Sequence, residues 1–152
     1  MTRAIGELDW RGAAQAAPDV LLREVRVLDP RSGLDAPHDV LVRGGRIAEL
    51  AAPGSAELRG GESELEVIEG GGLTAVPAFF DPHVHLRTPG REDKEDIETG
   101  SRAAAAGGYC GIIGMANTDP PIDTPGAIES LRERAGADAS IPVGFVATVT
   151  RG

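Results

Sequence analysis

The sequence predicts an α/β fold in which strands and helices alternate along the C-terminal half of the chain. Apolar runs typical of strands lie near 79–85, 109–115 and 142–149, and helical patterns lie between them near 92–106 and 125–135. Glycine is abundant, with 21 residues, whereas aromatic residues make up only 3% of the chain, and small side chains let helices pack closely on a sheet. This alternation is typical of parallel βαβ units, which open either a closed barrel or a doubly wound sheet.

The N-terminal half of the chain predicts a small β region. A turn sequence at 29–33 separates a first apolar run from a second, and Gly44 and Gly45 join the second run to a third as a tight hairpin. Residues 53–64 are rich in Gly, Ser and Glu and predict a surface loop. We therefore expect an antiparallel β unit that carries no catalytic residue. The expected divisions are an unassigned extension at 1–18, the β region at 19–76 and the α/β region at 77–152.

The helical patterns have recognisable ends. The first begins with acidic residues, which suit the positive end of the helix dipole, and continues into an Ala-rich segment of high helix propensity. Gly107 and Gly108 follow as its stop. Thr124 is the expected N-cap of the second helix, with Pro125 at its first position.

Charge and cysteine content limit the partners and the compartment. A formal net charge of −9 argues against a nucleic-acid partner, because phosphate binding needs clustered Lys and Arg. Cys110 is the one cysteine, which excludes an internal disulfide and fits a reducing cytoplasm. No apolar run approaches the roughly 20 residues that a membrane helix needs, and the N-terminus lacks the apolar stretch of a signal peptide. The sequence therefore predicts a cytoplasmic protein that binds neither nucleic acid nor membrane.

The feature that carries chemistry is the pair His83 and His85, at the end of the first apolar run of the α/β region. Residues two apart in a strand point to the same side, so both imidazoles face one way at the strand's carboxyl end. Active sites of parallel barrels lie at that end, and two neutral imidazoles there can bind one metal ion. Asp81 and Arg87 share the same parity and face the same way if the strand stays extended.

The alternative is that His83 and His85 are ordinary surface histidines, because His-x-His is a common tripeptide. Three observations favour the metal site. An apolar strand precedes the pair, two of the chain's three histidines lie here, and a turn at 87–90 follows where a βα loop is expected. His38, the third histidine, follows Pro37 in a turn and is given no role.

Asn117 lies just after the second strand of the α/β region. Because the carboxyl ends of parallel strands meet at one edge of a sheet, Asn117 is a candidate for the same site as the histidines. The alternative is that the sequence Asn-Thr-Asp-Pro serves only as a turn, and local sequence leaves both interpretations open.

The segment 77–87 resembles the Asp-x-His-x-His signature of the amidohydrolase superfamily. Its continuation is similar to the dihydroorotase family, in the longer bacterial type. The resemblance covers about residues 20–150 and is most specific over 77–125. The matching segments beyond the signature are Arg87-Thr88-Pro89-Gly90, Lys94-Glu95-Asp96-Ile97, residues 100–108 and Asn117-Thr118-Asp119-Pro120-Pro121.

This resemblance implies the N-terminal part of a metal-dependent (β/α)8 TIM barrel, preceded by part of a small β-sandwich domain. It implies reversible, zinc-dependent hydrolysis of the cyclic amide of (S)-dihydroorotate to N-carbamoyl-L-aspartate, in de novo pyrimidine biosynthesis, with one or two zinc ions per complete site. His83 and His85 match two zinc ligands of the family. Arg87 and Asn117 match residues that hold the substrate carboxylate, and a guanidinium fork suits a carboxylate.

The resemblance also implies that much of the site lies beyond Gly152. A barrel of this kind needs about 250 residues, and the family's catalytic aspartate, its other metal ligands and the closing strands of its sandwich would follow. We therefore expect an N-terminal fragment of a longer product that is inactive by itself. Ala78 and Ala116 depart from the family, which usually has Gly and Pro at these positions.

Other functions stay open. Allantoinases and dihydropyrimidinases hydrolyse other cyclic amides, and allantoinases share the His-x-His-x-Arg stretch, whereas the Lys-Glu-Asp and Asn-Thr-x-Pro sequences favour dihydroorotase. Non-catalytic dihydroorotase-like subunits scaffold aspartate carbamoyltransferase and tend to lose the metal histidines, whereas His83 and His85 are present here. The expected partners at full length are the small-molecule substrate, further copies of the chain in a homo-oligomer and, as a candidate, aspartate carbamoyltransferase.

Overall fold

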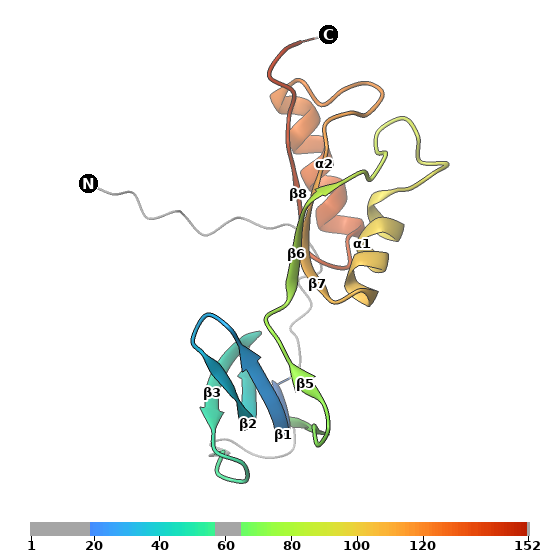
Figure 1. The fold of residues 1–152 in the computed structure, drawn as a ribbon. Helices are drawn as coiled ribbons and strands as arrows, with labels where there is room; N and C mark the ends of the chain where they lie inside the picture. The colour runs from blue at the N-terminus through green and yellow to red at the C-terminus, as the bar shows by residue number, and fades with distance from the viewer. Residues whose placement is uncertain (1–18, 57–64, 152) are drawn as a thin grey trace, which may run out of the picture. The chain divides into compact units, whose positions relative to one another are not determined.

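The computed structural model describes residues 19–56 and 65–151 (Figure 1). Contacts divide these residues into two compact units, of which one ends at Pro77 and the other begins at Ala78. The extension predicted at 1–18 and most of the loop predicted at 53–64 lie outside the described residues. Within the described residues, no helix is long and apolar enough to cross a membrane.

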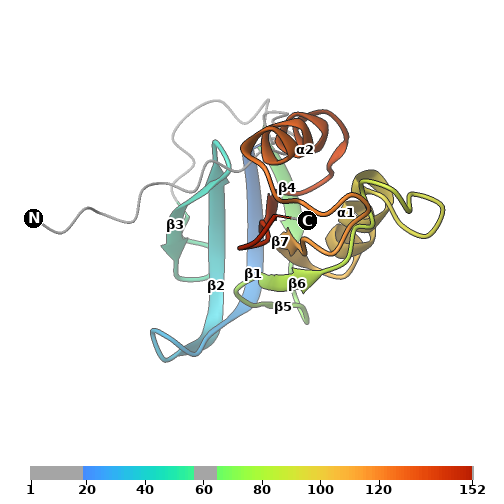
Figure 2. The ribbon, with the colours of Figure 1, turned by 90° about the horizontal axis from the view of Figure 1, so that it is seen from above.

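The N-terminal unit is a five-stranded sheet in which β3, β2, β1 and β4 lie in that order and β5 also pairs with β1 (Figure 2). Pairing is antiparallel from β1 to β3, as predicted. β4 and β5 come after the runs predicted to pair antiparallel, and both run parallel to β1. The strands are β1 Asp19–Asp29, β2 Leu34–Arg43, β3 Arg46–Ala51, β4 Leu65–Glu69 and β5 Thr74–Ala75.

The predicted tight hairpin joins β2 to β3 through Gly44 and Gly45, whose φ angles are 55° and 73°. Two successive residues with positive φ make the turn that matches the twist of neighbouring antiparallel strands, and glycine adopts this conformation without steric cost. The two glycines therefore fix the register between β2 and β3.

The buried carboxylate of Asp39 stabilises a β-bulge in β1. The register between β1 and β2 shifts between Leu22 and Val25, and Glu24 there has a φ of 53°. Asp39 is only 2% exposed and accepts hydrogen bonds from the backbone N–H groups of Glu24, at 3.0 Å, and Gly54, at 2.8 Å. Since an unpaired buried N–H is costly, Asp39 compensates the Glu24 N–H that the bulge takes out of the strand ladder, and it also binds the backbone after β3.

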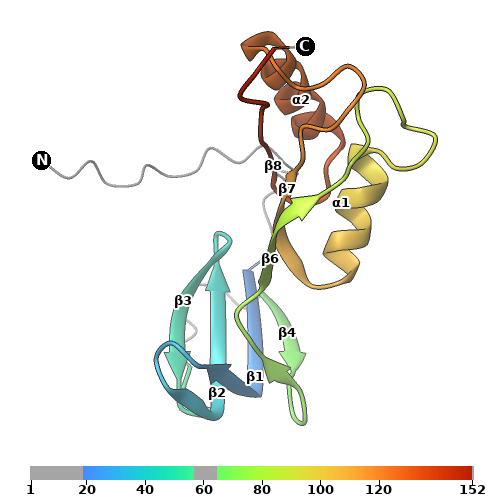
Figure 3. The same ribbon diagram turned by 45° about the horizontal axis from the view of Figure 1, so that its top comes forward.

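The C-terminal unit is a parallel sheet, β6-β7-β8, as the alternating pattern predicted. Figures 1 and 3 show α1 and α2 on the same side of this sheet. Buried apolar side chains from both helices and from the strands form one core, which includes Ile97, Leu131, Ile112 and Val143. The elements are β6 Phe79–Val84, α1 Ile97–Ala106, β7 Tyr109–Gly114, α2 Pro125–Asp138 and β8 Val143–Phe145.

Side-chain caps decide where the helices begin. The predicted N-cap Thr124 is confirmed, with its hydroxyl accepting from Ala127 N at 3.2 Å and Pro125 in the first turn of α2. The expected start of α1 at residue 92 is wrong. Asp96 caps the helix by accepting from Thr99 N at 2.7 Å, while Asp96 N donates to the Thr99 hydroxyl at 3.3 Å. This capping box satisfies two backbone groups at the helix entry and overrides the helix propensity of the charged residues before it.

The third strand is shorter than its apolar run, because β8 ends at Phe145 where the sequence predicted a strand to 149. Thr148 N donates to Ile122 O at 2.8 Å, which turns the chain after β8 toward the loop that follows β7. Backbone bonding to a neighbouring loop therefore ends the strand although the apolar character continues through Val149.

Replacing Asp96 with Ala should loosen the first turn of α1. Loss of an N-cap costs about 1 kcal/mol. The hydrogen bond from Thr99 N–H lowers the pKa of the Asp96 carboxyl. A lowered carboxyl pKa stabilises the fold above the unfolded pKa of about 3.9, and that contribution is lost as the pH falls through the folded value. Hydrogen exchange of the α1 amides should therefore be faster in Asp96→Ala at neutral pH, with the difference from wild type shrinking in acid.

The matched control is Asp93→Ala, because Asp93 is exposed and its one ion pair among the described residues is with Arg91 at 3.4 Å. A surface ion pair of this kind contributes little, so exchange in α1 should be unchanged. Equal acceleration in both variants would show that the capping box does not hold the helix entry.

Candidate functional site

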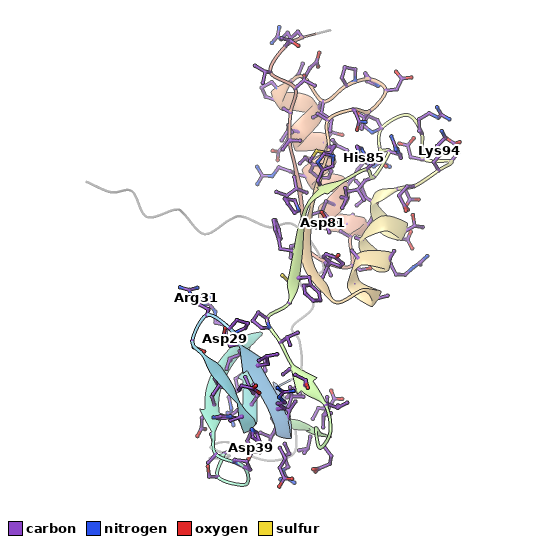
Figure 4. The ribbon with its side chains drawn as sticks, viewed as in Figure 1. Asp29, Arg31, Asp39, Asp81, His85 and Lys94 are labelled. Carbon is purple, nitrogen blue, oxygen red and sulfur yellow. The ribbon has the colours of Figure 1, made fainter. Side chains whose placement is uncertain are left out.

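Two histidine rings lie together where β6 ends. His83 is in the strand and His85 follows its last residue, Val84; both histidines are exposed. Their ring centroids are 5.2 Å apart and the ring planes meet at 68°. Leu86, by contrast, is 4% exposed and belongs to the core. Figure 4 shows His85 beyond Asp81, at the end of β6 where the connecting loops gather.

The spacing of the two rings fits a shared metal ion. A Zn–N bond is about 2.0–2.1 Å long and a ring nitrogen lies about 1.1 Å from its centroid, so two imidazoles on one tetrahedral zinc have centroids about 5 Å apart. The centroids of His83 and His85 are 5.2 Å apart. Both rings are accessible from solvent, so a metal ion could reach them without a change in the strand.

The expected row of four polar side chains on one face does not form. The pairing of β6 with β7 shifts register between Asp81 and Val84, and Asp81 Oδ1 accepts a hydrogen bond from His83 N at 2.9 Å. Arg87 has a φ of 58°, in the left-handed region. The strand therefore does not stay extended through Arg87, and the parity argument fails for that residue.

Asn117 comes from the loop after β7 and reaches the histidine pair. Its Oδ1 atom lies 2.8 Å from His85 Nδ1, although 32 residues separate the two along the chain. The strand ends are brought together by the backbone, because Met115 N donates to Val84 O at 2.9 Å. The sequence predicted that both loops reach one edge of the sheet, but it did not reveal this hydrogen bond.

Arg87 lies two residues beyond His85 in the loop that follows β6, and it is partly buried. Its carbonyl oxygen accepts from Arg91 N at 2.9 Å, which closes the first turn of that loop. Across the described residues, no hydrogen bond or ion pair joins the Arg87 side chain to His83, His85 or Asn117. Side-chain contacts thus join three of the four predicted site residues, and among the described residues Arg87 is linked to them through the loop that it shares with His85.

The loops after β6 and β7 brace each other, a feature that sequence reasoning missed. Asp119 N donates to Pro89 O at 3.1 Å. Gly90 has a φ of 102°, and a Cβ added there would lie 1.8 Å from Asp119 O. Thr88 is 1% exposed, and in the described part of the chain its hydroxyl is the one buried side-chain oxygen without a hydrogen-bond partner. Gly90 was visible in the sequence, but its role depends on a loop that lies 29 residues further on.

The ligand set is incomplete within residues 19–56 and 65–151, where no group of three or more His, Cys, Asp or Glu side chains is placed to hold a metal ion. Catalytic zinc normally has three protein ligands and a water. The described residues therefore supply a histidine pair, and the remaining ligands of a catalytic centre would have to come from elsewhere.

Fold and site together define a parallel α/β protein with a histidine pair at the carboxyl edge of its sheet. Residues 72–151 match the family described as "Dihydro-orotase-like". The chain belongs to this family.

Proteins of similar sequence support the same family. The chain is 42% identical over 132 residues to a dihydroorotase of Streptococcus pneumoniae serotype 4, an alignment that covers 87% of this chain and 30% of that protein. It is 44% identical over 118 residues to a dihydroorotase of Thermus aquaticus, covering 78% of this chain and 25% of the relative. The chain thus spans less than a third of the length of these relatives.

Among solved structures, the chain is similar to the L-hydantoinase (dihydropyrimidinase) of Arthrobacter aurescens. The TM-score is 0.73 at 27% identity, and the match covers 86% of this chain and 28% of that structure. The backbone of most of this chain is therefore similar to part of that structure.

Gly90→Ala should separate the two loops that carry the site. Its methyl group would lie 1.8 Å from Asp119 O at a φ of 102°, where side chains rarely fit. We expect a loss in the free energy of unfolding of more than about 1 kcal/mol and faster hydrogen exchange at Asp119. The control Gly126→Ala in α2 meets nothing within 4 Å, so it should be neutral or slightly stabilising. Unchanged exchange at Asp119 in Gly90→Ala would contradict the bracing role.

Proposed function

We propose that the whole protein is a dihydroorotase, which interconverts (S)-dihydroorotate and N-carbamoyl-L-aspartate in pyrimidine biosynthesis. The observation that carries this proposal is the pair His83 and His85 beside Asn117, in a chain 42–44% identical to proteins named dihydroorotase. The positions of these residues at the carboxyl ends of two adjacent parallel strands suit an active site of a parallel barrel.

We infer that His83 and His85 hold zinc, with one or two ions at the complete site. The chemistry that a zinc ion held by these histidines would supply is a water with its pKa lowered to roughly 7 and polarisation of the amide carbonyl. His83 and His85 would bind the ion as neutral imidazoles, and the exposed rings leave room for the substrate. We infer that residues 1–152 alone do not turn over substrate. The described residues include no group of three or more side chains placed to hold a metal ion, and the family resemblance implies that the catalytic aspartate follows later in the longer protein.

We infer that Arg87 and Asn117 bind the substrate carboxylate. Arg87 lies on the same loop as His85, and a guanidinium can donate two parallel hydrogen bonds to a carboxylate. No ion pair among the described residues involves Arg87, so none of them competes with a substrate carboxylate for its guanidinium. Asn117 accepts at Oδ1 from His85, and its amide N–H groups are the donors that would face the substrate.

We infer that the parallel sheet β6-β7-β8 is the opening of a (β/α)8 barrel and that the N-terminal sheet is part of a β-sandwich. Large apolar side chains of the C-terminal unit are exposed, among them Phe79 at 59%, Phe80 at 44% and Val149 at 104%. Exposed apolar surface of this kind favours coverage by further protein. The family resemblance also supports a cytoplasmic homo-oligomer, with aspartate carbamoyltransferase as a candidate partner.

The second candidate is a hydrolase of uncharged cyclic amides. The similarity to an L-hydantoinase (dihydropyrimidinase), with a TM-score of 0.73, favours it. Lower identity to that structure, 27% against 42–44% to dihydroorotases, favours the first candidate. The two candidate functions differ in whether the substrate carries a carboxylate that Arg87 could bind.

Replacing His83 or His85 with Ala in the full-length protein should remove most of the bound zinc and most of the dihydroorotase activity, because each supplies one of few ligands. Metal analysis and the rate of dihydroorotate hydrolysis are the measurements. His38→Ala is the control, since the His38 ring lies 3.1 Å from Ala36 O in the N-terminal unit. Zinc content that stays at the wild-type level in both variants would refute the metal assignment.

Arg87→Ala should discriminate between the two candidate functions. A hydrogen bond to a charged group contributes about 1.5–3 kcal/mol, so kcat/KM for dihydroorotate should fall roughly 10- to 100-fold. The loss should be much smaller for an uncharged cyclic imide. Arg91→Ala is the control, because Arg91 is exposed and pairs with Asp93. Equal losses on both substrates would assign Arg87 a structural role and favour the second candidate.

A further inference from the structure

We propose that Asn117 is a positioning residue for His85: its side-chain oxygen holds the proton of the imidazole on Nδ1 and thereby presents Nε2 to the metal ion. The observation is the 2.8 Å distance between Asn117 Oδ1 and His85 Nδ1. The inference rests on the proposed metal at the histidine pair. It gives Asn117 a second role that does not depend on the identity of the substrate.

The chemistry of the imidazole makes this contact consequential. A neutral histidine has one N–H and one free lone pair, and the hydrogen bond at one nitrogen decides which nitrogen binds a metal. An amide oxygen can only accept, so Asn117 Oδ1 at 2.8 Å favours the form with the proton on Nδ1. The lone pair then lies on Nε2, at the far side of the ring from Asn117.

The surrounding backbone holds Asn117 in place. Ala116 before it is 9% exposed, and Ile122 after it is 1% exposed. Ile122 N donates to Ala116 O at 3.3 Å, and Thr148 N donates to Ile122 O at 2.8 Å. The loop is thus closed at its base by buried residues and tied to the chain after β8, so the backbone that carries Asn117 is held without a bound ligand.

The same amide can serve two partners at once. Oδ1 is engaged by His85, whereas the Nδ2 group still has two N–H donors. If the proposed function is correct, these donors face the substrate carboxylate, and one side chain links the metal ligand to the substrate. The link to His85 requires no substrate, so it can be measured separately.

The experiment uses the full-length protein and zinc alone, without substrate. Zinc affinity is measured by competition with a chromophoric chelator for wild type, Asn117→Ala and Asn117→Asp. Loss of a partner behind a metal ligand typically reduces affinity about 10- to 100-fold, which is the loss expected for Asn117→Ala. Asn117→Asp keeps an oxygen acceptor for Nδ1–H, so its zinc affinity should stay within a few fold of wild type or increase.

Thr118→Val is the control for general loosening of the loop, because the Thr118 hydroxyl donates to Pro120 O at 2.7 Å and does not contact His85. It should retain zinc affinity. Equal affinities in wild type, Asn117→Ala and Asn117→Asp would overturn the proposal. A loss in Thr118→Val as large as that in Asn117→Ala would overturn it as well, because loop order would then explain the effect.

A second measurement does not require metal. In the metal-free protein with ¹⁵N-labelled histidine, the nitrogen shifts of neutral His85, assigned by their absence in His85→Ala, report which nitrogen is protonated. Wild type and Asn117→Asp should show the proton on Nδ1, and Asn117→Ala should move toward the form with the proton on Nε2. Protonation on Nε2 in wild type would refute the positioning role. A protein that gives the expected forms but does not hydrolyse dihydroorotate would instead contradict the proposed function.

Discussion

The parallel pairing of β6 with β7 is the constraint on which the site depends. Val84 lies opposite Gly114, and Met115 N donates to Val84 O at 2.9 Å just where both strands end. This backbone alignment places His85 and Asn117 within hydrogen-bond distance across 32 residues of sequence. An antiparallel arrangement would send the loop after β7 to the opposite edge of the sheet, so the contact exists only because the intervening helix returns the chain to start a parallel strand.

Side chains alternate between the core and the solvent at the end of β6, and this alternation keeps the site exposed while the helices pack on the other face. Leu86 is buried in the core that the helices cover, whereas His83 and His85 are exposed. Burial of Ile97, Ile112 and Leu131, each at most 3% exposed, fixes the helices against the strands. The polar residues at the strand ends therefore do not have to contribute to the stability of the core, and their own hydrogen bonds decide how they are oriented.

Local signals predicted the elements of the C-terminal unit well, because each depends on a few neighbouring residues. Apolar runs gave the three strands, and Thr124 with Pro125 gave the start of α2. The start of α1 was predicted too early, because propensity along residues 92–95 says nothing about the reciprocal bonds of Asp96 and Thr99. Parity predicted the histidine pair and failed at Arg87, where the backbone has left the strand. The hydrogen bond between His85 and Asn117 was not predictable, because it depends on how the ends of β6 and β7 are aligned along the strand direction.

Each strand end of the parallel sheet has a different task. β6 ends in the two histidines, and the loop after β7 supplies Asn117, which holds one of them. β8 is followed by Val146, Ala147 and Thr148, none of which is a usual metal ligand, and Thr148 instead bonds to Ile122 O and closes the Asn117 loop. The three strand ends thus provide a histidine pair, a hydrogen bond to one of its rings and a backbone support for the loop that makes this bond. Because the third strand end adds no usual ligand, a three-ligand metal site at this edge would need donors from outside these three strand ends. The relatives are more than three times as long as the matched region, so they have further chain that could supply them.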